Sequence, residues 1–189
     1  MKYAGLFFLG MILSGSLVQA QTPSIAEKTD GLTKTSGFFD YFFDEDKGQL
    51  WLQVDELNKQ FLYVNYLAAG VGSNDIGLDR SQPGGSRIVY FEKRGPKLFL
   101  IQPNLDYIAR SDNELEKKSV REAFASSVLA SFDIAAASNG SYLIDLSPYL
   151  IRDAHDITGR LRRMNEGTFS LDKSRSALYA EGTFNFPKN

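Results

Sequence analysis

The sequence predicts an α+β fold: an antiparallel, twisted sheet of hairpins with two helices packed on one face. Two observations lead to this prediction. Short aromatic and β-branched runs follow one another at close spacing with turn residues between them, as in an antiparallel meander rather than a parallel sheet. In addition, two segments in the second half begin with residues that cap helices and continue at helical spacing.

Residues 1–20 have the three parts of a secretory signal peptide. Lys2 supplies the positive charge, residues 4–18 the apolar core, and residues 18–20 a small-residue cleavage site. Removing the segment changes the formal net charge from −2 to −3, because Lys2 is lost. We therefore expect an exported protein in the periplasm, at the cell surface or in the extracellular medium. An uncleaved anchor is the alternative, but the apolar run is short for a span and is interrupted at residues 14–16.

The rest of the chain has the composition of a packed globular protein. Hydrophobic residues make up 43% of the sequence and aromatic residues 13%. Residues 21–36 are polar and aperiodic, so we expect a flexible leader there and a single α+β domain over residues 37–189. The slightly acidic balance, without a basic block, argues against nucleic acid or an anionic membrane surface as the main partner. Because there is no cysteine, the core of this exported chain must form without disulfides.

Strand-favouring runs occupy most of the expected domain. They are residues 38–43, 50–54, 61–67, 87–92, 98–102, 132–137, 142–146, 168–171 and 177–179. The polar residues 44–48 indicate a hairpin loop, residues 94–97 a second turn, and Asn139-Gly140 a third, because both of these residues tolerate positive φ. The acidic residues of the first loop suit a solvated hairpin tip better than a cation site.

Helices are expected to begin near Ser111 and Ser147. Ser111 and Glu114 have the spacing of a capping box, and Ser147-Pro148 gives a cap followed by proline at the first helical position. A core-facing stripe at 4-3-4-3 spacing extends the second helix to residue 164; it consists of Leu150, Ala154, Ile157, Leu161 and Met164. Arginines at 160, 162 and 163 lie near the C-terminal end of this helix, where positive charges suit the helix dipole. Asp156 and Arg160 have the spacing of an i,i+4 ion pair. The alternative is that the three arginines bind an anion.

A glycine-rich loop at residues 70–85 separates two of the strands. It carries five glycines in sixteen positions and is longer than most loops in compact domains. The candidate loop or interface residues are Asn74, Asp75, Asp79 and Arg80. One interpretation is a recognition loop, and the other is an Ω-type loop closed by its own Asp and Asn hydrogen bonds. Leu78 and Asp79 stand where a phosphate-binding loop needs Lys and Ser or Thr, and the calcium-loop pattern is absent.

No catalytic residues and no metal ligands can be assigned. The single histidine, His155, lies off the apolar stripe, and without a second histidine or any cysteine the chain cannot build a His-based zinc site by itself. No Gly-x-Ser-x-Gly elbow is present to expose a nucleophilic serine. We therefore expect no cofactor in this chain.

Four segments carry a resemblance to a known family: residues 72–80, 152–155, 174–179 and 185–189. Together they resemble the N-terminal region of exported bacterial zinc-dependent metalloproteases of the His-Glu-x-x-His type, in which a domain of unknown function precedes the catalytic domain. The resemblance implies a non-catalytic accessory domain, with zinc only in a C-terminal metalloprotease domain that is its partner in cis. The sequence stops before any zinc-binding segment, so we expect a fragment, truncated at its C-terminal end, with no turnover of its own.

A second hypothesis belongs to a different class of function. The chain would be an independent exported module that presents the glycine-rich loop and the aromatic residues between 38 and 51 to a glycan or a peptide. Neither hypothesis involves a membrane once the signal peptide is removed.

Overall fold

The computed structural model describes residues 22–70, 72 and 74–188, so the predicted signal peptide lies outside the described residues. Eight strands dominate the structure, with short α and 3-10 helices between them. The strands are β1 (Thr33–Thr35), β2 (Asp40–Asp44), β3 (Gln49–Val54), β4 (Phe61–Leu67), β5 (Gln82–Arg94), β6 (Lys97–Gln102), β7 (Ser127–Ser138) and β8 (Ser141–Asp145). The helices are α1 (Ile25–Lys28), η1 (Asn74–Ile76), α2 (Glu114–Ala123), α3 (Ser147–Leu150), α4 (Ile157–Arg163), η2 (Lys173–Arg175) and η3 (Ala180–Gly182).

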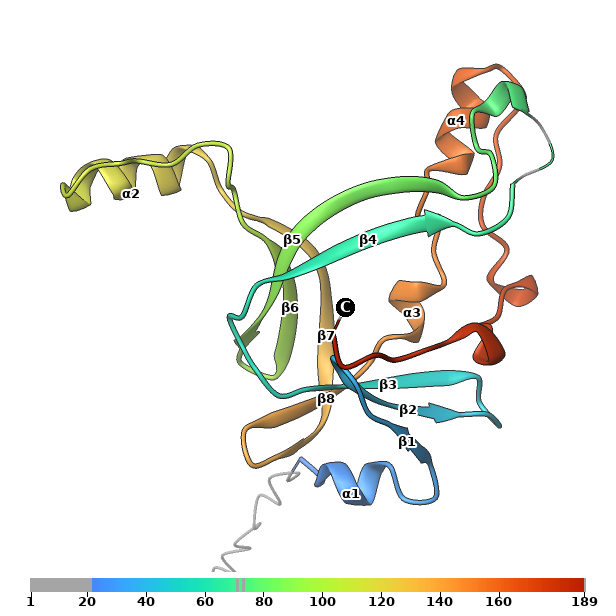
Figure 1. The fold of residues 1–189 in the computed structure, drawn as a ribbon, viewed down its shortest axis with the longest axis horizontal. Coiled ribbons are helices and arrows are strands. Elements are labelled where there is room, and N and C mark those ends of the chain that lie inside the picture. The colour runs from blue at the N-terminus through green and yellow to red at the C-terminus, as the bar shows by residue number, and fades with distance from the viewer. Residues whose placement is uncertain (1–21, 71, 73, 189) are drawn as a thin grey trace, which may run out of the picture.

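The strands form one antiparallel sheet in the order β1-β2-β3-β8-β7-β6-β5-β4. The sheet curls into a half-barrel, so that β4 and β5 arch over the side of the sheet that contains β1, β2 and β3 (Figure 1). The antiparallel α+β prediction is confirmed at this level. The expected arrangement of two helices on one face is wrong, because the curled sheet covers much of its own core and the helices lie at separate places around it.

The predicted hairpins form where turn residues allow positive φ. Asn139 and Gly140 connect β7 to β8 with φ values of 51° and 86°, and Gly95 connects β5 to β6 with φ 57°. Residues 45–48 connect β2 to β3, as expected. The expected strands at 168–171 and 177–179 are wrong: these residues lie in irregular chain around η2 and η3.

The main core fills the concave side of the sheet. It consists of Leu50, Leu52, Val54, Val89, Phe91, Leu98, Leu100, Phe132 and Ile144. The two ends of the sheet meet there through aromatic rings, with Phe39 5.1 Å from Phe61 and Phe61 5.8 Å from Phe91 between ring centroids. Burying each large apolar side chain contributes roughly 1.5–3 kcal/mol, so this cluster is the main source of stability.

Residues 22–36 differ from the expected flexible leader. Ser24 and Glu27 form a capping box that begins α1, and Ile25 is buried to 7% exposure in a second core cluster with Phe42 and Trp51. The Ile25 amide donates to Ser138 Oγ at 3.0 Å, and β1 pairs with β2. Burial of Ile25, which periodicity cannot reveal, therefore anchors this segment to the convex face of the sheet together with these backbone contacts.

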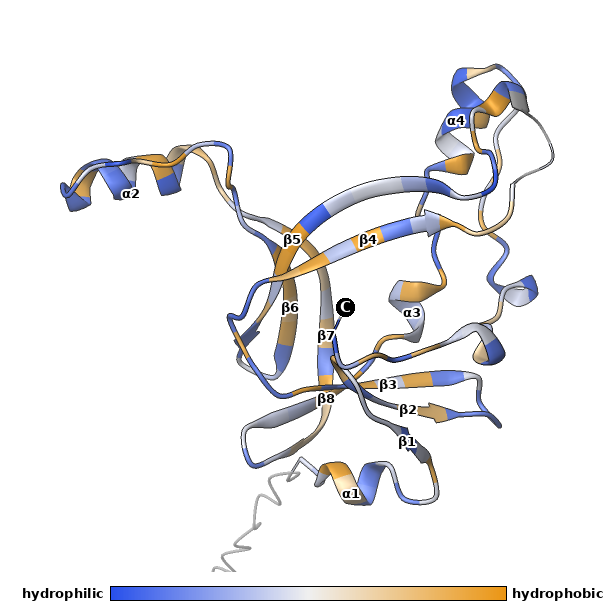
Figure 2. Ribbon diagram, viewed as in Figure 1, coloured by the Kyte–Doolittle hydropathy of each residue, from blue (hydrophilic) through white to orange (hydrophobic). Residues whose placement is uncertain are grey.

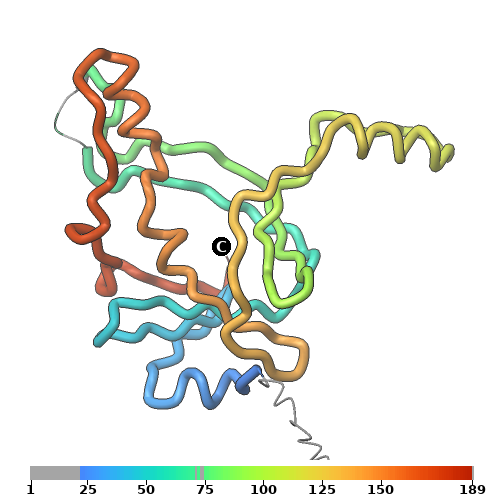
Figure 3. Tube along the Cα trace, turned by 180° about the vertical axis from the view of Figure 1, so that it is seen from behind, coloured from blue at the N-terminus to red at the C-terminus, as the bar shows by residue number. Residues whose placement is uncertain are grey.

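Helix α2 lies away from the sheet. It begins after Asn113, whose side chain accepts from the Leu115 amide at 2.9 Å, and not after the predicted cap Ser111. No residue of α2 is buried, and the helix extends with its flanking loops as an arm from the body (Figures 1 and 3). Figure 2 shows hydrophilic and hydrophobic residues together along this arm. The prediction that this helix packs on the sheet is wrong.

The second predicted helix is broken into two. Helix α3 ends at Leu150, and α4 begins only at Ile157 after Asp156, which has a left-handed φ of 53°. A right-handed helix cannot continue through that conformation. The predicted core stripe is therefore not continuous, and its end residues Leu150 and Met164 are exposed.

Candidate functional site

The predicted loop residues lie at the tip of the β4–β5 hairpin. Asn74 begins η1, while the side chains of Asp75, Asp79 and Arg80 are exposed. Within the described part of the chain, none of these three side chains forms a hydrogen bond or an ion pair. These three side chains therefore lie exposed at the hairpin tip, and no hydrogen bond or ion pair links them there.

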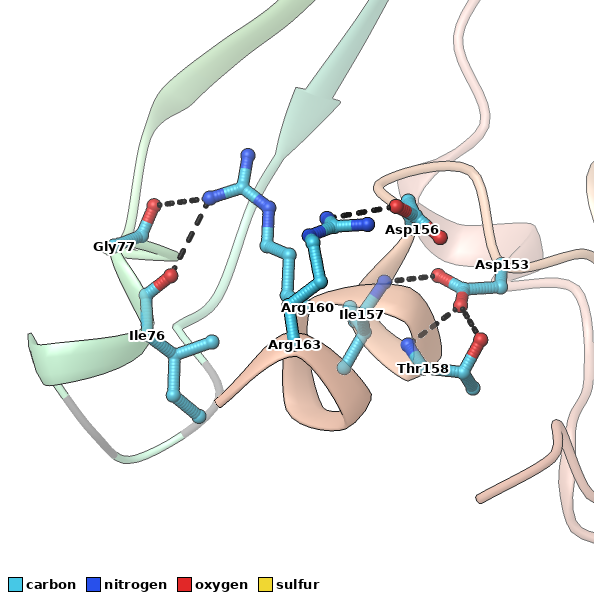
Figure 4. Close-up of polar contacts among 8 residues, drawn as sticks. All are labelled: Ile76, Gly77, Asp153, Asp156, Ile157, Thr158, Arg160 and Arg163. Atoms are coloured by element: carbon cyan, nitrogen blue, oxygen red, sulfur yellow. Dashed lines mark hydrogen bonds and ion pairs between the residues drawn. The ribbon is translucent and has the colours of Figure 1, made fainter. Parts of the chain in front are cut away.

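Other residues hold the loop in place. Leu78 is 2% exposed, and Arg160 of α4 donates from Nη1 to the carbonyl oxygens of Gly77 at 3.1 Å and Ile76 at 3.3 Å (Figure 4). Gly77 has φ 66°, a conformation that suits glycine. The expected pair of Asp156 with Arg160 is wrong, because Asp156 accepts from Arg163 Nη2 at 2.9 Å instead.

Asp153 fixes the start of the helix that provides Arg160. Its carboxylate accepts from the Ile157 amide at 2.8 Å, the Thr158 amide at 2.9 Å and the Thr158 hydroxyl at 2.8 Å (Figure 4). Burial raises the pKa of this carboxyl, but the hydrogen bonds from the Thr158 and Ile157 amides outweigh burial, so the pKa lies below its ordinary value of 3.8. Both carboxylate oxygens of Asp153 thus cap the first turn of α4.

His155 packs against the backbone of the hairpin. A Cβ added at Gly84 would lie 2.9 Å from the Asn65 carbonyl oxygen and 3.3 Å from His155 Cε1. Only glycine leaves room for this approach between β4, β5 and the connection from α3 to α4. The position of His155 is explained by packing.

A cavity of about 270 Å³ opens on the concave side of the sheet, between β4 and α3. Its apolar lining includes Phe38, Phe61 and Leu100, and two tyrosines, Tyr63 and Tyr149, also line it. Burial raises the pKa of Tyr149 to about 12, with a further increase from Tyr63 and an opposing effect of Arg152 and Arg87. Sequence reasoning missed this cavity, because its walls come from segments far apart in the chain.

The last described segment, residues 164–188, crosses the open side of the half-barrel (Figure 1) and is hydrogen-bonded to residues 35–39, between β1 and β2. Asn185 accepts from the Phe38 amide at 3.1 Å and donates to the carbonyl oxygens of Phe39 at 2.5 Å and Thr35 at 3.1 Å. Large apolar side chains of this segment are exposed nevertheless: Phe169, Leu171, Tyr179, Phe184 and Phe186.

Neither a metal cluster nor a membrane span is found in residues 22–70, 72 and 74–188. No group of three or more His, Cys, Asp or Glu side chains there is placed to hold a metal ion. None of the helices there has both the length and the apolar character needed to cross a bilayer.

Comparison with protein families gives one match. The family described as a domain of unknown function (DUF5117) matches residues 81–189, which is more than half of the chain. The matched region runs from β5 onward and includes Arg87, Arg152, Arg160 and Asn185, whereas Asn74, Asp75, Asp79 and Arg80 precede it. No match is found among curated proteins or among solved structures.

Proposed function

We propose that this chain, which belongs to the DUF5117 family, is a non-catalytic accessory domain of a secreted zinc-dependent metalloprotease. Its partner would be a metalloprotease domain of the His-Glu-x-x-His type, joined in cis. The resemblance of residues 72–80, 152–155, 174–179 and 185–189 supports this family context. The chain has one histidine and no cysteine, so it cannot supply the two histidines of such a zinc site, which would belong to the partner.

One observation carries the proposal: the exposed apolar side chains of residues 169–186. Tyr179 and Phe184 are 72% and 73% exposed, although this segment is hydrogen-bonded to the body through Asn185 and through Thr183, whose carbonyl oxygen accepts from Tyr41 at 3.0 Å. Exposed apolar side chains that form a contiguous patch are typical of an interaction surface, and we propose that those of this segment form such a patch. Aromatic side chains are also the residues that contribute most to binding energy at protein interfaces.

A binding titration with a separately produced His-Glu-x-x-His domain tests the proposal. The double variant Tyr179→Ser, Phe184→Ser should weaken association at least tenfold while the melting temperature stays near that of the wild type, because both side chains are exposed. Leu115→Ser is the matched control, since Leu115 is 76% exposed on the α2 arm. Equal affinities for wild type and double variant would contradict the proposed surface. Chelator-sensitive casein cleavage by the purified chain alone would contradict the non-catalytic role.

The concave cavity favours a second candidate, an independent exported module that binds a glycan or a peptide. The aromatic residues expected to form its surface are divided between the two faces of the sheet. Phe38 and Phe39 line the cavity, whereas Phe42 and Trp51 are buried in the cluster with Ile25. Phe38 and Phe39 would therefore contact a ligand in this cavity, and Phe42 and Trp51 would not. This candidate would be favoured if the purified chain bound a glycan or a peptide and if its affinity did not change when a catalytic domain was added.

A further inference from the structure

Strand β7 pairs with two different strands, and one of its edges is only partly covered. β6 pairs with residues 127–133 of β7 and β8 with residues 134–138, on opposite edges. Among the residues that the structure describes, the edge that faces β8 therefore has no partner strand beside residues 127–133. In that part of the chain, no backbone hydrogen bond from outside the sheet reaches residues 127–133 either. The sheet thus has a free edge in its middle, beyond the end of β8 at Asp145.

The pairing with β6 shows which backbone groups lie along this free edge. The register is regular between Asp133 and Ala130, and the Ile134 amide donates to the Pro96 carbonyl oxygen at 3.0 Å, on the side of β6. In an antiparallel ladder, the backbone groups of successive residues point to alternate edges of the strand. The amide and the carbonyl of Ser131 therefore point away from β6. Ser131 thus presents both a donor and an acceptor to an added strand.

A hollow of about 600 Å³ lies along the free edge, between β7 and α3. Ser131, Phe132 and Asp133 line it, so side chains from both faces of β7 border the space, as expected beside the edge of a strand. Pro148 and Tyr149 of α3 line the other side, and the Tyr149 ring lies 5.9 Å from the Phe132 ring between centroids. Figure 1 shows α3 beside this part of β7. The volume falls within the range of known ligand sites.

The charged side chains that line the hollow are acidic. They are Asp133 and Asp145, and none of the described residues in the lining is Lys, Arg or His. Asp133 forms an ion pair with Lys97 at 2.7 Å. Asp145 takes part in none of the ion pairs of the described residues, and its oxygens accept only from neutral donors, the Ser147 amide at 2.9 Å and Gln49 Nε2 at 3.3 Å. A positive side chain would therefore complement the charge of Asp145.

We propose that the free edge of β7 binds an extended peptide segment of a partner protein as an added strand, with a lysine or arginine of that segment on Asp145. Addition of a strand satisfies the backbone groups of an exposed edge, while neighbouring side chains select the sequence. Trp51 is opposite Asp145 in the β3–β8 pairing and also lines the hollow, so it contacts the apolar stem of the basic side chain.

The sequence of the free edge agrees with this role. Edges that must stay unpaired are commonly protected by lysine or proline, and residues 127–133 contain neither. The proposal goes beyond the accessory role and does not depend on it, because every group that forms the site belongs to this chain. It also concerns a different place from the cavity lined by Phe38 and Phe39.

Hydrogen exchange detected by NMR tests whether the edge is free and whether a peptide covers it. The probe is the peptide acetyl-Thr-Val-Lys-Val-Thr-amide. In the chain alone, the Ser131 amide should exchange faster than the Phe132 amide, which points to β6. Saturating peptide should slow exchange at Ser131 at least tenfold and leave the α2 arm unchanged. Protection of Ser131 in the chain alone would overturn the proposal. If protection instead appears as the chain is concentrated without peptide, a second copy occupies the edge and the proposal is wrong.

Calorimetric titration tests the role of the charge. The lysine peptide should bind at least tenfold more tightly than acetyl-Thr-Val-Glu-Val-Thr-amide. Asp145→Asn, which keeps an acceptor for the Ser147 amide, should reduce the affinity for the lysine peptide at least tenfold. Asp112→Asn is the matched control, because Asp112 is an exposed aspartate before α2, and it should bind as the wild type does. The comparison of the two peptides needs no variant, so it holds even if Asp145→Asn fails to fold.

N-methylation of the lysine peptide tests the strand pairing. Methyl groups on the amides of its second and fourth residues, or of its third and fifth, remove the donors of alternate edges. Only one of these sets faces β7, so one methylated peptide should bind at least tenfold more weakly and the other as the unmodified peptide does. Equal affinities of all three peptides would overturn the proposal. So would equal binding of the lysine and glutamate peptides, absence of binding by both, or unchanged affinity in a folded Asp145→Asn variant.

Discussion

Arg160→Met should destabilise the fold by releasing the glycine-rich loop from α4. Arg160 Nη1 donates to the carbonyl oxygens of Gly77 at 3.1 Å and Ile76 at 3.3 Å, and methionine keeps most of the apolar stem without either bond. A hydrogen bond from a charged group contributes about 1.5–3 kcal/mol. The two bonds here share one nitrogen and are long, so we expect a loss of about 1–2 kcal/mol in the free energy of unfolding. In a chain of this size that corresponds to roughly 2–8 °C in melting temperature.

Thermal melts of Arg160→Met and of the control Arg162→Met measure this effect. Arg162 is an exposed arginine of the same helix, so its replacement should change the melting temperature by no more than about 1 °C. Limited trypsin digestion adds a local readout, because release of the loop should speed cleavage after Arg80. If Arg160→Met has the melting temperature of the wild type and trypsin cleaves it after Arg80 at the same rate, Arg160 does not anchor the loop.

Three further predictions concern the loop side chains, Asp153 and Asn185. Asp75→Ala and Arg80→Ala should leave the melting temperature within about 1 °C of the wild type, since both side chains are exposed; a loss above 2 °C in melts of either variant would show that the loop depends on them. The pKa of Asp153 is lowered in the fold, so its contribution to stability is present above the ordinary value of 3.8 and disappears as the pH falls through the folded-state pKa. Urea unfolding from pH 7 to pH 3 should therefore show a steeper decline for the wild type than for Asp153→Asn, and parallel curves would contradict the assignment. Asn185→Ala removes three hydrogen bonds to residues 35–39 and should cost about 1–3 kcal/mol; unchanged hydrogen exchange at residues 35–39 would count against this role.

Local patterns predicted the parts of the fold that depend on local chemistry. Asn139-Gly140 specifies its hairpin because both residues adopt positive φ there. The short apolar runs around residues 50–54 and 98–102 form strands with mostly buried side chains. The curl of the sheet was not predictable, because it depends on long-range contacts such as that of Phe39, which precedes β2, with Phe61 of β4 at the far edge of the sheet.

The helix predictions were wrong where tertiary contacts override local preference. The stripe from Leu150 to Met164 predicts one helix, but Arg152 lies against Tyr63 and Asp153 caps a new helix at Ile157, so the chain turns between them. Periodicity records which residues are apolar and not whether a polar residue between them has a distant partner.

Sequence reasoning singled out the glycine-rich loop but did not predict its contact with α4. Arg160 was interpreted as a helix-dipole residue, and its bonds to loop carbonyls leave no mark in the sequence. The bond from Arg152 to Tyr63 similarly joins residues that are 89 positions apart in the chain.

Hydrogen–deuterium exchange in the presence of a separately produced His-Glu-x-x-His domain tests the proposed accessory role most directly. Burial of the exposed apolar side chains between Phe169 and Phe186 predicts slower exchange in this segment when the catalytic domain is added. The α2 arm, Glu114–Ala123, serves as the internal reference and should exchange at an unchanged rate. If exchange over residues 169–186 stays unchanged when the catalytic domain is in large molar excess, the proposed accessory role is contradicted.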